Sequence, residues 1–406
     1  MKKLFFFMFA AALISACSMD NDPRDPGEAY PDPAIADDVY SGEGGYDEGG
    51  GNGQGEAGQS GMVTAGEWRD LDNWLFWSTL MTEAQPDQTG FSYSEYNAYW
   101  GLYTNNRVAV RVKDETGLLQ RDVPVQLKIG SSVLYEARTD NKGETNLFVG
   151  LTQLEQSVDA QWLELVVNGV PQTKQVNVTA WGDSVVWNEC LASVTPTTNI
   201  DIAFFVDATG SMTDEISFLK ADLTDIIQKV QAQQTSASIR TAALFYRDEG
   251  DDYVTKVNDF SSNLSTTVSF IAKQNADGGG DYPEAVHTAF ETGLQQLSWR
   301  EENSIRLAFL LLDAPPHHQE DVIASLQRSI PQYAKRGIRI IPVAASGVDK
   351  PTEFFLRYTA IATDGTYVFL TNHSGIGGEH IQATVGEYQV ELLNDLIVRL
   401  INQYLE

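Results

Sequence analysis

Three oxygen-bearing side chains stand at alternate positions in the stretch DIAFFVDATGSM, residues 201–212. Asp207, Thr209 and Ser211 follow an apolar run that is typical of a buried strand, and Gly210 stands between the two hydroxyls. A carboxylate and two hydroxyls so close in sequence can surround one cation, and all-oxygen ligands favour hard cations over Zn²⁺ or Cu²⁺. The spacing therefore predicts a cation site where this strand ends.

Two further stretches bring carboxylates toward such a site. The apolar run RLAFLLLD ends in Asp313, and the glycine-rich stretch NADGGGDYPEAV carries Asp277 and Asp281. These stretches hold no thiol, and imidazoles occur only at their border, in His317 and His318. We therefore expect a divalent cation, Mg²⁺ first, with Mn²⁺ or Ca²⁺ as alternatives.

The elements that position these residues alternate between strands and helices from residue 199 onward. Strands are expected at IDIAFFVD, IRTAALFY, YVTKVNDF, RLAFLLLD, IRIIPVAA and TYVFL, and helices over 213–234, near 264–273, 283–297, 320–336 and 352–361, and from Glu387. This alternation predicts an α/β fold with a doubly wound, mostly parallel sheet and helices on both faces. Ligands bind such sheets at the carboxyl ends of the strands, which is where Asp207 and Asp313 fall.

Residues 199–406 resemble a von Willebrand factor A (vWA) domain. DATGSM matches the metal-ion-dependent adhesion site (MIDAS) of that family, written Asp-x-Ser/Thr-x-Ser. The similarity continues in order through FYRDEGDDY, DFSSN, GGGDYPEAV, LSWRE and LLLDAPPHH, a pattern also seen in alpha-kinase-associated vWA proteins. One Asp-x-Thr-x-Ser alone would be weak evidence, and it is the ordered series of segments that makes the resemblance specific.

The resemblance implies a set of metal ligands. Thr209 and Ser211 would offer hydroxyl oxygens, and Asp207 and Asp313 would act directly or through water. The loop threonine of the family falls at or near Asp281, with Asp277 as the alternative. A carboxylate at this place would neutralise more of the ion's charge, which argues against capture of an acidic ligand. Because vWA domains are typically non-catalytic, we expect a binding module and no enzyme.

Polar residues near the same edge are expected to form a rim that contacts a ligand. We assign Asp248, Asp277, Glu284 and His317 to this rim. Asp248, Asp251 and Asp252 follow a strand parallel to the first one, so a second cation site there is an alternative to a solvated turn.

The N-terminus has the features of a bacterial lipoprotein signal. Lys2 and Lys3 precede an apolar stretch of eleven residues, Leu4 to Ile14, which is too short to span a bilayer. The following Ile-Ser-Ala-Cys resembles a lipobox. Residues 1–17 are therefore predicted to be a signal peptide, with Cys17 acylated and holding the protein on a membrane. The only other cysteine, Cys190, is expected to be a small buried residue without chemistry.

Residues 18–61 are predicted to form a disordered, acidic, glycine-rich tether. The segment holds eleven acids and one base, Arg24, so it has too little apolar surface to offset its ordering entropy and its charges repel one another. The acids soon after Cys17 resemble the export signal of surface lipoproteins in the Bacteroidetes. An outer membrane lipoprotein is expected, with surface display and periplasmic retention both open.

Residues 62–192 are expected to form a smaller antiparallel β-sandwich preceded by a short amphipathic helix. Short runs of alternating polarity, such as NRVAVRVKD and VPVQLKIG, are separated by turn signals. The stretch from Val110 to Leu147 resembles the carboxypeptidase-regulatory, transthyretin-like module, which serves as a spacer or as a support that faces sugars or proteins. A boundary is expected at residues 193–199.

Composition narrows the partners. The formal charge of −29 excludes nucleic acid as a natural partner. The expected function is a membrane-anchored module whose vWA domain binds a divalent cation and engages a protein or glycan in adhesion. The alternatives are a periplasmic assembly scaffold and, behind it, a metal-dependent hydrolase.

Overall fold

The computed structural model describes residues 59–83, 92–155, 157–195, 199–233 and 237–405. The predicted signal peptide 1–17 and most of the tether predicted over 18–61 lie outside the described residues. No helix in the described ranges is both long enough and apolar enough to cross a membrane.

The largest element is an eight-stranded sheet with the strand order β11-β10-β9-β12-β13-β14-β1-β15. The five central strands, β10 to β14 in that order, run parallel, whereas β11 and β1 run antiparallel to their neighbours. The bounds are β1 (Thr64–Trp68), β9 (Asn199–Asp207), β10 (Ser238–Tyr246), β11 (Thr255–Ser261), β12 (Ser304–Leu312), β13 (Ile338–Ala344), β14 (Tyr367–Leu370) and β15 (Glu391–Leu392). The mixed α/β fold with a large, mostly parallel sheet is therefore confirmed.

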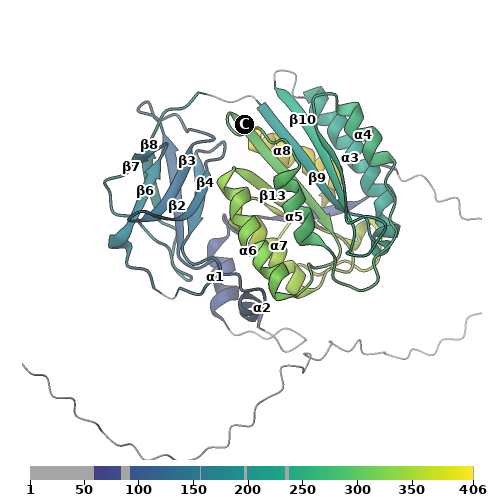
Figure 1. The fold of residues 1–406 in the computed structure, drawn as a ribbon, viewed down its shortest axis with the longest axis horizontal. Coiled ribbons are helices and arrows are strands. Elements are labelled where there is room, and N and C mark those ends of the chain that lie inside the picture. Colours follow the sequence, from purple (N-terminus) through teal and green to yellow (C-terminus); the bar gives the residue numbers. More distant parts are fainter. Residues whose placement is uncertain (1–58, 84–91, 156, 196–198, 234–236, 406) are drawn as a thin grey trace, which may run out of the picture. The chain divides into compact units, whose positions relative to one another are not determined.

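Helices cover both faces of this sheet, because its central strands are apolar on both sides. Alternate residues of β9, such as Phe204 and Val206, pack with α3 (Thr213–Gln233), α4 (Leu264–Ala272) and α8 (Leu393–Leu405). The residues between them, such as Phe205, pack with α5 (Val286–Gln295), α6 (Glu320–Lys335) and α7 (Lys350–Ala362). Figure 1 shows α5, α6 and α7 lying together on one side of the strands.

Strand β1 departs from the expected organisation. Residues 64–68 were expected with the sandwich, but they pair antiparallel with β14 and β15 in the large sheet. The short strand β14 gains a partner in this way, and Val63 and Ala65 join the core beneath α8. Because β15 follows at Glu391–Leu392, the last helix begins at Leu393, later than the predicted Glu387.

Two smaller sheets follow β1 along the chain, after the helices α1 (Trp74–Thr82) and α2 (Tyr96–Trp100). Their strand orders are β5-β2-β8 and β4-β3-β6-β7. The bounds are β2 (Arg107–Lys113), β3 (Pro124–Ile129), β4 (Ser132–Arg138), β5 (Glu144–Phe148), β6 (Leu163–Val167), β7 (Val170–Pro171) and β8 (Trp187–Leu191). The expectation that this region forms a wholly antiparallel β-sandwich is wrong for one pair of strands. Strand β8 pairs with the edge of β2 that β5 leaves free, and it runs parallel to β2.

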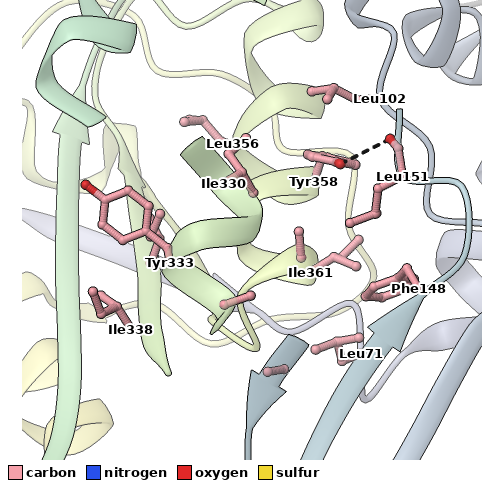
Figure 2. Close-up of a cluster of buried hydrophobic side chains, with 14 of the residues drawn as sticks. Leu71, Leu102, Phe148, Leu151, Ile330, Tyr333, Ile338, Leu356, Tyr358 and Ile361 are labelled. Carbon is pink, nitrogen blue, oxygen red and sulfur yellow. Dashed lines mark hydrogen bonds between the residues drawn. The ribbon is translucent and has the colours of Figure 1, made fainter. Parts of the chain in front are cut away.

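The small sheets share a core with the large one. Figure 2 shows Leu71, Phe148 and Leu151 beside the α7 residues Tyr358 and Ile361, and the Tyr358 hydroxyl donates to the carbonyl of Leu151 at 3.3 Å. The same cluster contains Cys190, which is buried as expected. The expected boundary at residues 193–199 therefore does not divide the hydrophobic core, because one buried cluster contains residues from both sides of it.

Candidate metal centre at the carboxyl edge of the sheet

Asp207 and Asp313 reach the same edge because their strands are parallel neighbours. Asp207 is the last residue of β9, and Asp313 directly follows β12, with Val206 paired to Leu311. The chain leaves β9 through α3 for β10 on one side and later enters β12 on the other side. The two aspartates thus lie at the point where the strand order reverses, which is the usual ligand position in such sheets.

The DATGSM segment folds its polar side chains toward one another. Oδ1 of Asp207 accepts hydrogen bonds from the backbone N–H of Thr209 at 2.9 Å and from its hydroxyl at 2.7 Å. The Thr209 hydroxyl lies 3.2 Å from that of Ser211. A Cβ on Gly210 would lie 2.9 Å from the carbonyl oxygen of Gly278, which explains the glycine between the hydroxyls. Asp207 and Thr209 are buried, whereas Ser211 is exposed.

Three carboxylate oxygens at this edge are buried without a hydrogen-bond partner. They are Oδ2 of Asp207, Oδ1 of Asp313 and Oε2 of Glu284. A buried acceptor left unpaired costs about 1–3 kcal/mol, and more when it is charged. A bound cation would satisfy such oxygens, so the donor set fits a hard metal ion.

Burial, together with neighbouring charges, raises the pKa values of these carboxyl groups. Burial, and next the charge of Asp313, raises the pKa of Asp207 to about 7. Burial raises the pKa of Asp313 to about 6, against the effect of a hydrogen bond from Ser211, and the charge of Glu215 adds to the rise. Burial and repulsion thus disfavour the charged form of these carboxyl groups in the metal-free protein, and a bound cation would favour it.

Glu284 lies deeper than its expected position on the rim. Its backbone N–H donates to the carbonyl of Pro315 at 2.9 Å, which joins the glycine-rich loop to the segment after β12. Its side chain is only 2 % exposed. Burial and the charges of Asp207, Asp248 and Asp313 raise the pKa of Glu284 to about 9. The signal in the sequence was its position directly before the apolar start of α5.

Asp281 and Asp277, the two candidates for the loop ligand, are both exposed. The Asp277 carboxylate lies 3.9 Å from the guanidinium of Arg247 and accepts from the N–H of Gly278 at 2.9 Å. The structure thus buries the carboxylate of Glu284 near Thr209, and it leaves those of Asp281 and Asp277 facing solvent.

The remaining rim residues come together beside this group. Nε2 of His317 lies 2.7 Å from Oδ1 of the buried Asp248. Oδ2 of Asp251 accepts from the N–H groups of Asp248 at 3.2 Å and Gly279 at 2.9 Å, so the loop after β10 is fastened to the glycine-rich loop. His318 points elsewhere and stacks on Tyr99 with 3.8 Å between the ring centroids.

Within the described residues, no group of three or more His, Cys, Asp and Glu side chains is placed so that it could hold a metal ion by itself. Asp207 and Asp313 would have to act with the hydroxyls of Thr209 and Ser211. The sequence predicts these four ligands together with Asp281, whose side chain is exposed in this structure.

Comparison with known proteins identifies a domain family in this chain. Residues 201–356 match the von Willebrand factor A domain. A putative ariadne-like RING finger protein of Acanthamoeba polyphaga mimivirus is 34 % identical over 131 residues, which cover 32 % of this chain and 12 % of the relative. The alpha-protein kinase vwkA of Dictyostelium discoideum is 29 % identical over 143 residues, which cover 35 % of this chain and 22 % of the kinase.

The chain thus spans less than a quarter of the length of these relatives. Among solved structures, the conserved hypothetical protein BatB from Bacteroides thetaiotaomicron is similar with a TM-score of 0.36 and 10 % identity, over 50 % of this chain and 98 % of BatB. The match over 201–356, with the α/β sheet and the DATGSM segment at its edge, shows that this chain contains a von Willebrand factor A domain.

Proposed function

We propose that this protein is a binding module whose vWA domain holds a divalent cation, Mg²⁺ first, and uses this edge of the sheet to engage a partner. Domains of this type typically mediate protein interaction or adhesion. The observation that carries the proposal is the pair of unpartnered buried oxygens on Asp207 and Asp313, beside the hydroxyls of Thr209 and Ser211. A cation at this place would satisfy both oxygens and offset the mutual repulsion of the carboxylates.

We further propose that Cys17 carries a lipid anchor that places the module on the outer membrane of a bacterium. The support is the basic, apolar and Cys-containing order of residues 1–17. A partner of protein or glycan chemistry would then be met at the cell envelope. A scaffold for a periplasmic assembly uses the same site with a different partner, so it stands as the second candidate.

Catalysis is not proposed. The kinase and the RING protein match this chain over 143 and 131 residues, which are 22 % and 12 % of their own lengths. Their names describe the whole proteins and not the matched parts. The hydroxyls and carboxylates of this edge are arranged around one another, as the bonds between Asp207 and Thr209 show, and this arrangement suits a bound cation.

Calorimetric titration of Mg²⁺ into the metal-free protein tests the site. The wild type should bind Mg²⁺, and its melting temperature should rise, because a ligand at 100 times its Kd stabilises the native state by about 2.7 kcal/mol. Asp207→Ala should remove both effects while the protein remains folded. Glu302→Gln removes an exposed carboxylate just before β12, at the opposite end of that strand from Asp313, so it is the matched control and should bind Mg²⁺ as the wild type does. Equal Mg²⁺ affinity in the wild type and in Asp207→Ala would refute the site.

A further inference from the structure

A small cavity lies at the end of the large sheet that is opposite to the candidate metal centre. Ser304 and Ile305, the first residues of β12, line it, whereas Asp313 follows the last residue of the same strand. Arg339 of β13 and Tyr404 of α8 line it too. The turns of the small sheets beside β3 and β4 supply the other lining residues, which are Arg121, Asp122, Thr139, Asp140 and Asn141. The volume of about 10 Å³ is the space that one water-sized sphere needs.

Arg339 brings a buried cation to this cavity. The residue is 4 % exposed, and its Nε is buried without a hydrogen-bond acceptor. Nη1 and Nη2 donate to the carbonyl oxygens of Gly337 at 3.3 Å and Arg138 at 3.2 Å. In the described part of the chain this guanidinium forms no ion pair, whereas the buried Arg306 pairs with Asp122. A buried charge without a counter-charge is costly, so Arg339 is a candidate to bind an anion.

The carboxylates that line the cavity are already bonded. Oδ1 of Asp122 accepts from Nη1 of Arg306 at 3.0 Å and from Nε of Arg138 at 2.5 Å. Oδ1 of Asp140 accepts from the N–H groups of Lys142 and Glu144, both at 2.9 Å. Asp122 thus balances two arginines, and Asp140 holds the turn before β5.

The positive charges of this region act on one another. Burial lowers the pKa of Arg306 although Asp122 opposes this, and the charges of Arg138 and Arg339 add to the fall. The charge of Arg339 also acts on the buried Asp364, yet burial raises the pKa of Asp364 and so disfavours its charged form. An anion in the cavity would offset the repulsion among the guanidinium groups.

We propose that the cavity binds one anion of the size of chloride, which accepts a hydrogen bond from Nε of Arg339. A polyatomic oxyanion such as phosphate needs more room than one water-sized sphere. Because the lining residues come from the small sheets as well as from β12, β13 and α8, the bound anion links the two parts of the fold. The inference goes beyond the proposed function and does not depend on it, since the metal centre lies at the other end of the strands.

Thermal melting of the full chain tests the proposal when chloride replaces gluconate at a constant ionic strength of about 0.15 M, which keeps the screening unchanged. Gluconate is too large for the cavity and serves as the reference anion. Chloride should raise the melting temperature by about 2 °C or more, because it binds the native state. Above the Kd the rise should follow the logarithm of the chloride concentration, in Mg²⁺ and in EDTA alike.

Three variants assign the effect to the cavity. Arg339→Gln should lose the rise, because it removes the buried positive charge. Arg121→Gln changes a partly exposed residue of the same cavity, should reduce the rise, and keeps the test open if Arg339→Gln does not fold. Arg328→Gln removes an exposed arginine of α6 and is the matched control, with the full rise expected. An undiminished rise in both cavity variants would overturn the proposal.

Crystals of the wild type soaked in sodium bromide locate the anion by its anomalous scattering. A bromide peak is expected within hydrogen-bonding reach of Nε of Arg339 and should be absent from Arg339→Gln. A water at that position and no bromide would overturn the proposal, because water would then satisfy the buried N–H. A bromide peak without any chloride-dependent rise in melting temperature would also overturn it, since the site would hold an adventitious ion only.

Discussion

Arg357 on α7 and Asp70 just after β1 form a buried bidentate ion pair. Nε and Nη2 of Arg357 donate to the two carboxylate oxygens of Asp70 at 2.9 Å and 2.6 Å, and both side chains are at most 1 % exposed. The guanidinium also lies 4.9 Å from the centre of the Trp77 ring. The ion pair therefore fixes the segment around Asp70, which precedes the small sheets, against α7 of the vWA domain, although the two residues lie far apart in the sequence.

Asp70→Ala should destabilise the protein by about 3–5 kcal/mol, because it leaves Nε and Nη2 of the buried Arg357 without their acceptors, with Glu353 at 3.9 Å as the remaining carboxylate. Urea unfolding measures the loss. Asp72→Ala is the control, since Asp72 pairs with Arg69 but its side chain is 56 % exposed, and such surface pairs contribute at most about 1 kcal/mol. Similar losses of stability in the two variants would show that the buried Asp70–Arg357 pair contributes no more than an exposed pair.

The fragment 199–406 should not melt cooperatively by itself, although the alternation of its elements suggests a complete domain. It lacks β1, which pairs β14 to β15, and it exposes the α6 and α7 residues that pack on Leu71, Phe148 and Leu151. A fragment that begins at residue 59 should melt in one transition, followed by circular dichroism. A sharp transition of 199–406 at the temperature of the longer fragment would contradict this.

Much of the large sheet could be predicted from the sequence, because continuous apolar runs such as IDIAFFVD and RLAFLLLD are buried on both faces. The position of β1 could not be predicted. Its five residues carry no strong strand pattern, and their partners in β14 lie about 300 residues away, as the Ala65–Leu370 pair shows. Only tertiary pairing decides such a strand.

The same division holds for the candidate site. Asp207, Thr209 and Ser211 share one short segment, so their spacing alone predicts that they meet. Asp281 and Glu284 are three residues apart on a loop, and the sequence does not reveal which one turns inward. The backbone bond from Glu284 to Pro315 decides it, and that bond depends on two loops meeting at the sheet edge.

Asp222→Asn should stabilise the protein at neutral pH. Burial raises the pKa of Asp222 to about 6, although it accepts a hydrogen bond from the N–H of Gly61 at 2.7 Å. Because the folded state holds this proton more tightly than the unfolded state does, the group's contribution to stability falls as the pH rises from about 4 to about 6. The loss amounts to about 3 kcal/mol at most and stays constant above that range.

Urea unfolding of the wild type and of Asp222→Asn between pH 4 and pH 8 measures this difference. The stability of the variant relative to the wild type should grow through that window and then level off. A constant difference would show that Asp222 titrates normally in the folded protein.

Gly365→Ala should destabilise the protein by about 3 kcal/mol or more, because a Cβ there would lie 1.8 Å from the carbonyl oxygen of Ile340. That oxygen belongs to the backbone of a central strand and has little room to move. Gly280→Ala meets nothing within 4 Å and serves as the control, with an expected change within about 0.5 kcal/mol. Thermal melts of both variants decide whether the close approach is real.

Glu284→Gln should weaken the binding of Mg²⁺, whereas Asp281→Asn should leave it nearly unchanged. The buried carboxyl group of Glu284 lies beside Thr209, and the charges of Asp207 and Asp313 act on it. Loss of a carboxylate that directly supports a metal site typically costs about 10- to 100-fold in affinity. The exposed Asp281 contributes through solvent, so its removal should change the affinity by no more than about twofold.

Isothermal titration of Mg²⁺ into the two variants and the wild type measures the difference, and melting in EDTA controls for folding. Because the pKa of Glu284 is raised to about 9, its carboxyl group is protonated in the metal-free protein at neutral pH, and the amide of Glu284→Gln replaces it with an uncharged group of the same shape. The metal-free variant should therefore melt no lower than the wild type, and a loss of Mg²⁺ affinity could not be attributed to unfolding. If Asp281→Asn instead loses the affinity and Glu284→Gln keeps it, the glycine-rich loop must turn over when the metal binds, and the ligand at this position is the one that the family resemblance implies.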